Sequence, residues 1–298
     1  WVTMATNPTR TGSRRPLTLS DRAEAHSWLA KHAGDDLETR TAGAELEQTG
    51  AGGSLNLMRA RSRFGELAFT LAGFRRFGQP RQLSPEQRRA IWFALCVRAC
   101  EGLDVNGWAD RLVRATSGDD AQYRSTAFEF EWATNLALSQ RDTHQQLAVS
   151  FIADSEEGRT ADLAVGDLVV VECKRLIHST EATSALRARA LRTTNKARSQ
   201  LPRDKPSIIC LDLYEPLLAL GASARDCEQR DVDNGLVALL GKHGRPSGLL
   251  YNMPHRDTDD PAARETIYNG NRSPTVPFPP EFELFPRFFP SRSETLRE

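Results

Sequence analysis

The feature that most constrains this chain is a short apolar segment that carries two charges. Residues 168–173 (Leu-Val-Val-Val-Glu-Cys) predict a strand that is apolar on both faces and therefore lies in the middle of a sheet. Glu172 and Lys174 are two residues apart, so the period of a strand directs both side chains to one face. The chain has only five lysines, and this one follows its most apolar strand. A buried strand tolerates such charges where they pair or bind a charged ligand.

An aspartate precedes this strand across a turn. Residues 160–165 and the strand flank Gly166-Asp167, which predicts a β-hairpin. Asp162 shares a face with Glu172 and Lys174 only if the numbers of paired residues have an even sum, for instance 162 opposite 172. A two-residue turn would direct Asp162 to the other face, so we predict an odd-numbered loop or a bulge. In that register two carboxylates and one ammonium converge, and such an oxygen site of low ligand number suits Mg²⁺ or Mn²⁺.

Asp162, nine intervening residues and Glu172-Cys173-Lys174 resemble the signature of the PD-(D/E)XK nuclease superfamily, the restriction-endonuclease-like fold. Ala161 stands where many members have a proline. The resemblance covers roughly residues 121–255 and implies an α/β fold in the α+β sense, with a core ordered helix, three antiparallel strands, helix, strand. It further implies that Asp162, Glu172 and the backbone carbonyl of Cys173 hold Mg²⁺ (or Mn²⁺) and that Lys174 acts in catalysis.

The remaining acid of the family comes from the helix before the strands, which we expect over residues 125–140. Two glutamates of that helix are candidates, Glu129 and Glu131. Glu129 shares a helical face with Trp132, Ala133 and Leu136, the side that should pack on the sheet. Glu131 lies on the side of Thr134, Asn135 and Leu138. We favour Glu129 as the catalytic acid and keep Glu131 as the alternative.

Further elements complete the expected order. We predict a strand over 146–152, a helix over 184–201, a strand over 207–213, a helix over 232–242 and a strand over 248–253. The helix over 184–201 should bury Leu186, Ala190, Ala197 and Leu201. Its basic residues Arg189, Arg192 and Lys196 fall on another side. Between residues 170 and 205 there are nine basic and three acidic residues, so these three and Arg175 predict a nucleic-acid-binding surface, with a merely solvated face as the alternative.

Two regions flank this core. Residues 1–120 predict an all-helical N-terminal domain in which 1–17 are disordered and helices cover 19–34, 55–77 and 108–115. Another helix begins at Ser84-Pro85, where serine caps the helix and proline occupies its first turn. Residues 256–298 form a Pro/Phe-rich C-terminal extension whose phenylalanines should dock on the body or on a partner. The helical domain and this extension are candidate surfaces for a homodimer or a protein partner.

Composition narrows the class of protein. With 39% hydrophobic and 26% charged residues, the chain is typical of a soluble globular protein. The formal net charge is zero, which argues against nucleic-acid binding by the whole surface but not by a local basic face. No apolar run is long enough to cross a bilayer, and the first residues lack the features of a signal peptide. We therefore expect a cytoplasmic protein without a membrane partner.

The sequence thus predicts a metal-dependent nuclease that hydrolyses phosphodiester bonds. A DNA endonuclease is favoured, with DNA preferred to RNA as the substrate, and a restriction or defence system is the setting that the resemblance implies. Two alternatives stay open. One is a catalytically silent nucleic-acid-binding protein on the same fold, and the other is a protein-interaction module.

Overall fold

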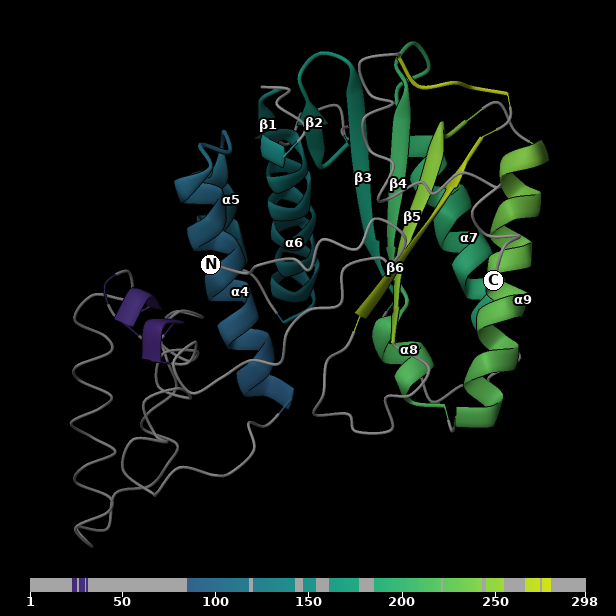
Figure 1. Ribbon diagram of the computed structural model, residues 1–298, viewed down its shortest axis with the longest axis horizontal. Coiled ribbons are helices and arrows are strands. Elements are labelled where there is room, and N and C mark those ends of the chain that lie inside the picture. Colours follow the sequence, from purple (N-terminus) through teal and green to yellow (C-terminus); the bar gives the residue numbers. More distant parts are fainter. Residues whose placement is uncertain are drawn as a thin grey trace, which may run out of the picture.

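The computed structural model describes residues 85–117, 120–142, 147–153, 161–176, 185–220, 222–242, 245–254, 266–273 and 275–279, and seven residues between 23 and 31. A six-stranded mixed sheet, ordered β1-β2-β3-β4-β5-β6, forms the centre. Helices cover both of its faces (Figure 1), with α4, α5 and α6 on one side and α7 and α9 on the other. The chain is therefore an α/β protein, as the sequence predicts. In the part that the structure describes, no helix has the length and apolarity needed to cross a membrane.

The helices of the first face bury their apolar sides against one another and against the sheet. They are α4 (Pro85–Gly102), α5 (Trp108–Ser117) and α6 (Asp120–Asp142). The predicted helix starts at Pro85 and Trp108 are confirmed. Phe93 of α4 meets Tyr123 and Phe130 of α6 edge to face, with ring centroids 5.2 and 5.7 Å apart. Phe130 also packs on Phe151 of the sheet, so helices and strands share one core.

Three antiparallel strands begin the sheet, and two parallel strands follow. The strands are β1 (Val149–Phe151), β2 (Leu163–Val165), β3 (Val169–Arg175), β4 (Ser207–Asp212), β5 (Gly248–Pro254) and β6 (Thr266–Arg272). β1, β2 and β3 are antiparallel neighbours, and β4 runs parallel to both β3 and β5. All five predicted strands are present, within a few residues of the expected bounds. Residues of β3 and β4 are buried on both faces, which explains their continuous apolar sequence.

The register of the hairpin is the one that the charge pattern requires. Leu163 pairs with Val171 and Val165 with Val169, so the numbers of paired residues have an even sum. The turn has three residues, Gly166-Asp167-Leu168, as the parity argument predicts. Gly166 has φ +52°, where a residue with a Cβ would cost about 1 kcal/mol. Beyond the last pair, the N–H of Asp162 donates to the carbonyl of Val171 at 3.0 Å, so the turn and this hydrogen bond hold Asp162 beside β3.

The second face of the sheet is covered by α7 (Ala185–Gln200) and α9 (Ala222–Lys242), while the short α8 (Tyr214–Leu218) follows β4. The four residues predicted to point inward from α7 are all buried: Leu186, Ala190, Ala197 and Leu201. Helix α9 begins ten residues earlier than expected. Its first half is polar and buries Arg225 and Gln229 instead of apolar residues, so periodicity of apolar residues does not reveal it.

The strand β6 lies beyond residue 255, where the sequence predicts no strand. It is antiparallel to β5, and its Asn271 donates hydrogen bonds to the hydroxyl of Tyr251 (2.9 Å) and to Asp233 (3.3 Å). The strand pairs with β5 along its whole length, from Thr266 to Arg272, and these side-chain bonds add to the backbone ladder. Further along the chain, Phe278 is buried in the core of the first face, which confirms docking on the body for this phenylalanine.

Several predictions concern residues outside the described part. These are the disorder of 1–17, the helix over 55–77 and the other phenylalanines of the C-terminal extension. The described residues between 23 and 31 are helical, in agreement with a helix over 19–34. Helices α4 and α5, predicted as part of the N-terminal region, share their core with α6 and with β1 to β3.

Candidate functional site

The candidate site lies where β2 and β3 separate. Pairing of these strands ends at Leu163 and Val171, while β3 continues to Arg175. The backbone N–H of Cys173 donates to Oδ2 of Asp162 at 2.7 Å, so the carboxylate accepts a bond that a strand carbonyl would otherwise accept. In an extended strand the N–H and C=O of a residue point to the same side. The carbonyl of Cys173 therefore faces the side on which Asp162 lies.

Glu172 and Lys174 form an ion pair on β3. Oε1 of Glu172 contacts Nζ of Lys174. Both side chains alternate with Val171 and Cys173, whose side chains belong to the core of α6, and so they point toward the face of α7. Glu172 is 1% exposed, whereas the side chain of Lys174 is 26% exposed. The ammonium therefore lies at the solvent end of the pair and the carboxylate at its buried end.

Glu129, the favoured acid of α6, reaches the same place through an arginine. Nε of Arg111 lies 2.6 Å from Oε2 of Glu129, and Nη2 of Arg111 lies 3.2 Å from Oδ1 of Asp162. Arg111 belongs to α5 and is 5% exposed. The structure thus brings together Asp162, Glu172, Lys174 and Glu129, with Arg111 as an additional cation between two carboxylates.

The carboxylates of this site perturb one another. Burial raises the pKa of Glu129 to about 7; the charge of Asp162 also raises it and Arg111 lowers it. Burial, together with the charges of Asp162 and Glu129, raises the pKa of Glu172 to about 7 although Lys174 opposes the shift. Burial likewise raises the pKa of Asp162. For Lys174, burial lowers the pKa, but the charge and hydrogen bond of Glu172 together with the charge of Asp162 raise it, so the net shift is upward. Such mutual shifts are typical of functional sites.

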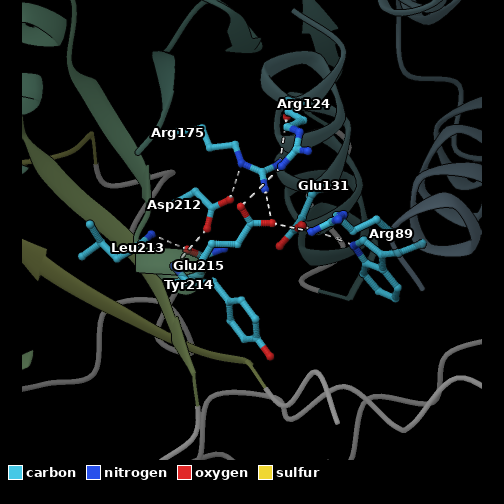
Figure 2. A network of polar contacts seen from close by, with 10 residues as sticks. Arg89, Arg124, Glu131, Arg175, Asp212, Leu213, Tyr214 and Glu215 are labelled. Atoms are coloured by element: carbon cyan, nitrogen blue, oxygen red, sulfur yellow. Dashed lines mark hydrogen bonds and ion pairs between the residues drawn. The ribbon is translucent and has the colours of Figure 1, made fainter. Parts of the chain in front are cut away.

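Glu131, the alternative helix acid, belongs to a different group. We call this group the arginine cluster; it consists of Arg89, Arg124, Arg175, Glu131, Asp212 and Glu215 (Figure 2). The indole N–H of Trp92 donates to Glu131 at 3.3 Å, and the two residues line a small pocket. Glu131 is therefore placed with the arginine cluster rather than beside Asp162.

Arg175 occupies a position that the sequence did not predict. Its Nη2 lies 2.7 Å from Glu215 and its Nε 3.4 Å from Asp212, and its side chain is 8% exposed. Because side chains alternate along a strand, Arg175 points to the face of α6, opposite to Lys174. A buried guanidinium that pairs with two carboxylates does not present itself to a phosphate. The structure therefore does not support Arg175 as a nucleic-acid contact, in contrast to the expectation from its place in the chain.

The other predicted phosphate contacts lie on α7. Arg192 and Lys196 are exposed, and Arg189 is partly exposed. The helix has five basic residues and no acidic one. Its outer side therefore remains a candidate surface for an anionic polymer.

Arg111 belongs to this site but is not among the residues that the sequence predicts for it. A signal for it exists, because Arg111 shares a helical face with Trp108 and Ala115, at i−3 and i+4. An arginine on an apolar helix face must find a carboxylate when it is buried. What the sequence alone does not supply is the identity of the partners, since Glu129 and Asp162 are 18 and 51 positions away.

The donor set fits a hard divalent cation. Oε2 of Glu172 is buried and has no hydrogen-bond partner within the described residues, which leaves one carboxylate oxygen available beside the Asp162 carboxylate and the carbonyl side of Cys173. Mg²⁺ commonly binds one or two carboxylates and keeps several waters. Over the same residues no set of three or more His, Cys, Asp or Glu side chains is gathered as a metal cage. No family model, curated protein or solved structure matches this chain.

Proposed function

We propose that the chain is a metal-dependent nuclease that hydrolyses phosphodiester bonds, with DNA as the favoured substrate. The observation that carries the proposal is the convergence of Asp162, Glu172 and Lys174 where β2 and β3 separate. Two carboxylates that can bind a metal ion and one amine that can stabilise negative charge are the groups that metal-assisted phosphoryl transfer uses. The spacing of the three residues is the spacing of the PD-(D/E)XK signature.

The topology supports the same proposal. Helix α6 is followed by the antiparallel strands β1, β2 and β3, then by α7 and by β4, which is parallel to β3. This is the order of the restriction-endonuclease-like core, and we propose that fold for residues 120–254. Glu129 of α6 lies in the group around Asp162, which supports its proposed role as the helix acid.

The residues divide the chemistry among them. Asp162, Glu172 and the Cys173 carbonyl would hold Mg²⁺ or Mn²⁺. The bound ion would polarise the phosphoryl group and lower the pKa of a bound water. Lys174, at the solvent end of its pair, can orient the attacking water and stabilise negative charge in the transition state. Glu129, held at 2.6 Å by Arg111, is placed to accept a proton or to engage the water network.

The basic side of α7 would bind the phosphate backbone of the nucleic acid. Lys174 points to the face that α7 covers, and Arg192 and Lys196 are exposed on that helix. Phosphate contacts by such side chains hold a strand without reading its sequence. We therefore assign Arg189, Arg192 and Lys196 to nucleic-acid binding and leave Arg175 out of this set.

A cleavage assay tests the proposal. Purified protein is incubated with plasmid DNA, single-stranded DNA and RNA in Mg²⁺, in Mn²⁺ and in EDTA. We expect cleavage with either metal ion and none in EDTA. The cleavage rates of Asp162→Asn and Glu172→Gln should be lower than that of the parent by about a hundredfold or more. Equal cleavage by the parent and both variants would place the activity elsewhere or in a contaminant.

A second function is favoured by one specific observation. Asp162 and Glu172 already have internal cationic partners, namely Arg111 and Lys174. Such a neutralised site suits a catalytically silent nucleic-acid-binding protein on the same fold. This alternative predicts that the protein retards DNA in a gel and that substitutions on α7 abolish the binding. It also predicts that no DNA is cleaved in Mg²⁺, in Mn²⁺ or in EDTA.

A further inference from the structure

Arg111 is a buried cation between two acids of the candidate site. Its guanidinium lies 2.6 Å from Glu129 and 3.2 Å from Asp162, and 5.7 Å from the ring centroid of Phe151. Close carboxylates repel one another unless a cation lies near them. The guanidinium of Arg111 is such a cation, and it offsets the negative charges of Glu129 and Asp162.

The backbone determines where this arginine lies. Residue Asn106, just before α5, donates its N–H to Val149 at 3.0 Å and accepts the N–H of Phe151 at 2.9 Å. Gly107 follows with φ +73°, and a Cβ there would lie 3.2 Å from the carbonyl oxygen of Phe151. The start of α5 is thus attached to β1, one turn before Arg111. The guanidinium is consequently presented to the acids by rigid elements and not by a long loop.

The two contacts of Arg111 are unequal. The contact to Glu129, at 2.6 Å, is 0.6 Å shorter than the contact to Asp162, at 3.2 Å, and the side chains of Arg111 and Glu129 are at most 5% exposed. The side chain of Asp162 is 17% exposed. Because a charge pair is weaker at longer distance and in a wetter place, the contact to Asp162 is the one that a competitor can replace.

We propose that Arg111 is the internal counter-cation of the candidate metal site: it balances Glu129 and Asp162 in the metal-free protein and competes with a divalent ion for Asp162. The inference rests on the proposed function for the assignment of Asp162 and Glu172 as ligands. Arg111 is accordingly a positioning residue that sets how tightly the site takes up metal. Its contact with Glu129 keeps that acid in place in either state.

Mn²⁺ binding measured by calorimetry tests the inference without any nuclease assay. We expect Arg111→Met to bind Mn²⁺ about tenfold or more tightly than the parent, since a cation near a carboxylate changes the affinity of that carboxylate for a positive charge by such factors. In EDTA the variant should unfold at a lower temperature, and Mn²⁺ should raise its unfolding temperature more than it raises that of the parent. Arg111→Lys, which keeps the charge, should return the affinity toward that of the parent.

A second buried arginine provides the matched control. Arg225 on α9 is buried and donates to the carbonyl of Leu220 at 3.3 Å. Arg225→Met should lower the unfolding temperature equally in EDTA and in Mn²⁺ and leave the affinity for Mn²⁺ unchanged.

The outcomes separate this inference from the proposed function. If the parent binds Mn²⁺ and Arg111→Met binds it equally or more weakly, the inference is overturned and the proposed nuclease stands. If only Arg111→Met binds Mn²⁺, the inference is supported; if neither protein does, both fail. Should Arg111→Met not fold, titration of the parent with Mg²⁺ should shift the ¹⁵N side-chain NMR signal of Arg111, assigned through Arg111→Lys, and an unchanged signal overturns the inference.

Discussion

Replacing Lys174 by methionine removes the ammonium of the candidate site and keeps most of the apolar length of the side chain. Lys174 is the cation nearest to Glu172 and lies at the solvent end of the pair. Loss of a group that stabilises transition-state charge typically lowers kcat by a factor on the order of 10² to 10³. We expect the same loss in the rate of phosphodiester cleavage by Lys174→Met, equivalent to roughly 3–4 kcal/mol.

The fold should survive this substitution near neutral pH. Burial, with the charges of Asp162 and Glu129, raises the pKa of Glu172 to about 7 even with the lysine present. Without the lysine the carboxyl of Glu172 can take up a proton. At pH ~7.5 the free energy of unfolding of Lys174→Met should therefore be lower than that of the parent by only about 1 kcal/mol. That loss corresponds to a decrease of roughly 2–4 °C in Tm for a domain of this size. Activity and stability therefore respond very differently to one change.

The sign of the pH dependence follows from the same shift. A carboxyl whose folded pKa is raised contributes stability that is fully present below its unfolded pKa and is lost as pH rises through the folded pKa. Without Lys174 the pKa of Glu172 should rise further, so the Tm of Lys174→Met should lie closest to that of the parent at acidic pH and should fall further below it as pH rises through about 7. Thermal unfolding in EDTA at several pH values measures this difference.

Single-turnover cleavage of plasmid DNA in Mg²⁺ is the assay for the rate. Lys242→Met is the matched control, because Lys242 is exposed at the end of α9, and its rate and Tm should match those of the parent. If Lys174→Met cleaves as fast as the parent while Mg²⁺ is required by both, Lys174 has no part in the chemistry and the reasoning is refuted.

Three further predictions concern parts of the molecule outside the metal ligands. For Glu215, burial raises the pKa, but three arginines of the cluster together lower it more, so the net shift is downward. Glu215→Gln should lower the free energy of unfolding by about 3 kcal/mol near pH 7. The difference between variant and parent should vanish as pH falls through the folded pKa of Glu215, and thermal unfolding between pH ~3 and ~7 measures it. Phe278→Ala should destabilise the protein by about 3 kcal/mol in urea unfolding, whereas Val113→Ala at an exposed site of α5 should change it by less than about 0.5 kcal/mol. Replacing Arg192 and Lys196 together by glutamate should weaken DNA binding and reduce its salt slope by about 2, with Tm unchanged; an unaltered slope would remove α7 from the interface.

The hairpin shows how far a sequence can predict a site. Parity required an odd-numbered loop or a bulge between the arms, and the structure has a three-residue turn there, with Leu163 opposite Val171. The argument works because a shift of one residue would move Asp162 to the face opposite to Glu172 and Lys174. The choice of Glu129 over Glu131 as the acid near the site rests on the same kind of reasoning, applied to a helix face.

Other features could not be reached in this way. The excess of basic residues between 170 and 205 predicts Arg175 as part of a nucleic-acid-binding surface, but such a count does not show which face of the strand a side chain occupies, and Arg175 pairs with Asp212 and Glu215 instead. Strand β6 is largely polar and is held by its backbone ladder with β5 and by the hydrogen bonds of Asn271, so neither alternation nor apolarity indicates it. Arg111 pairs with residues far away in the chain, and only the packing of α5 on β1 brings them together.

The early end of β2 explains how acids from two faces of one sheet can meet. Glu129 belongs to a helix on one face, whereas Glu172 points to the other, and a continuous ladder between β2 and β3 would separate them. Because pairing stops at Leu163 and the N–H of Cys173 turns to the Asp162 side chain, the sheet opens at that point. The charge of Glu129 then contributes to raising the pKa of Glu172, as does that of Asp162. The residues that end β2 are thus as necessary to the candidate site as the acids themselves, since they create the opening through which those acids interact.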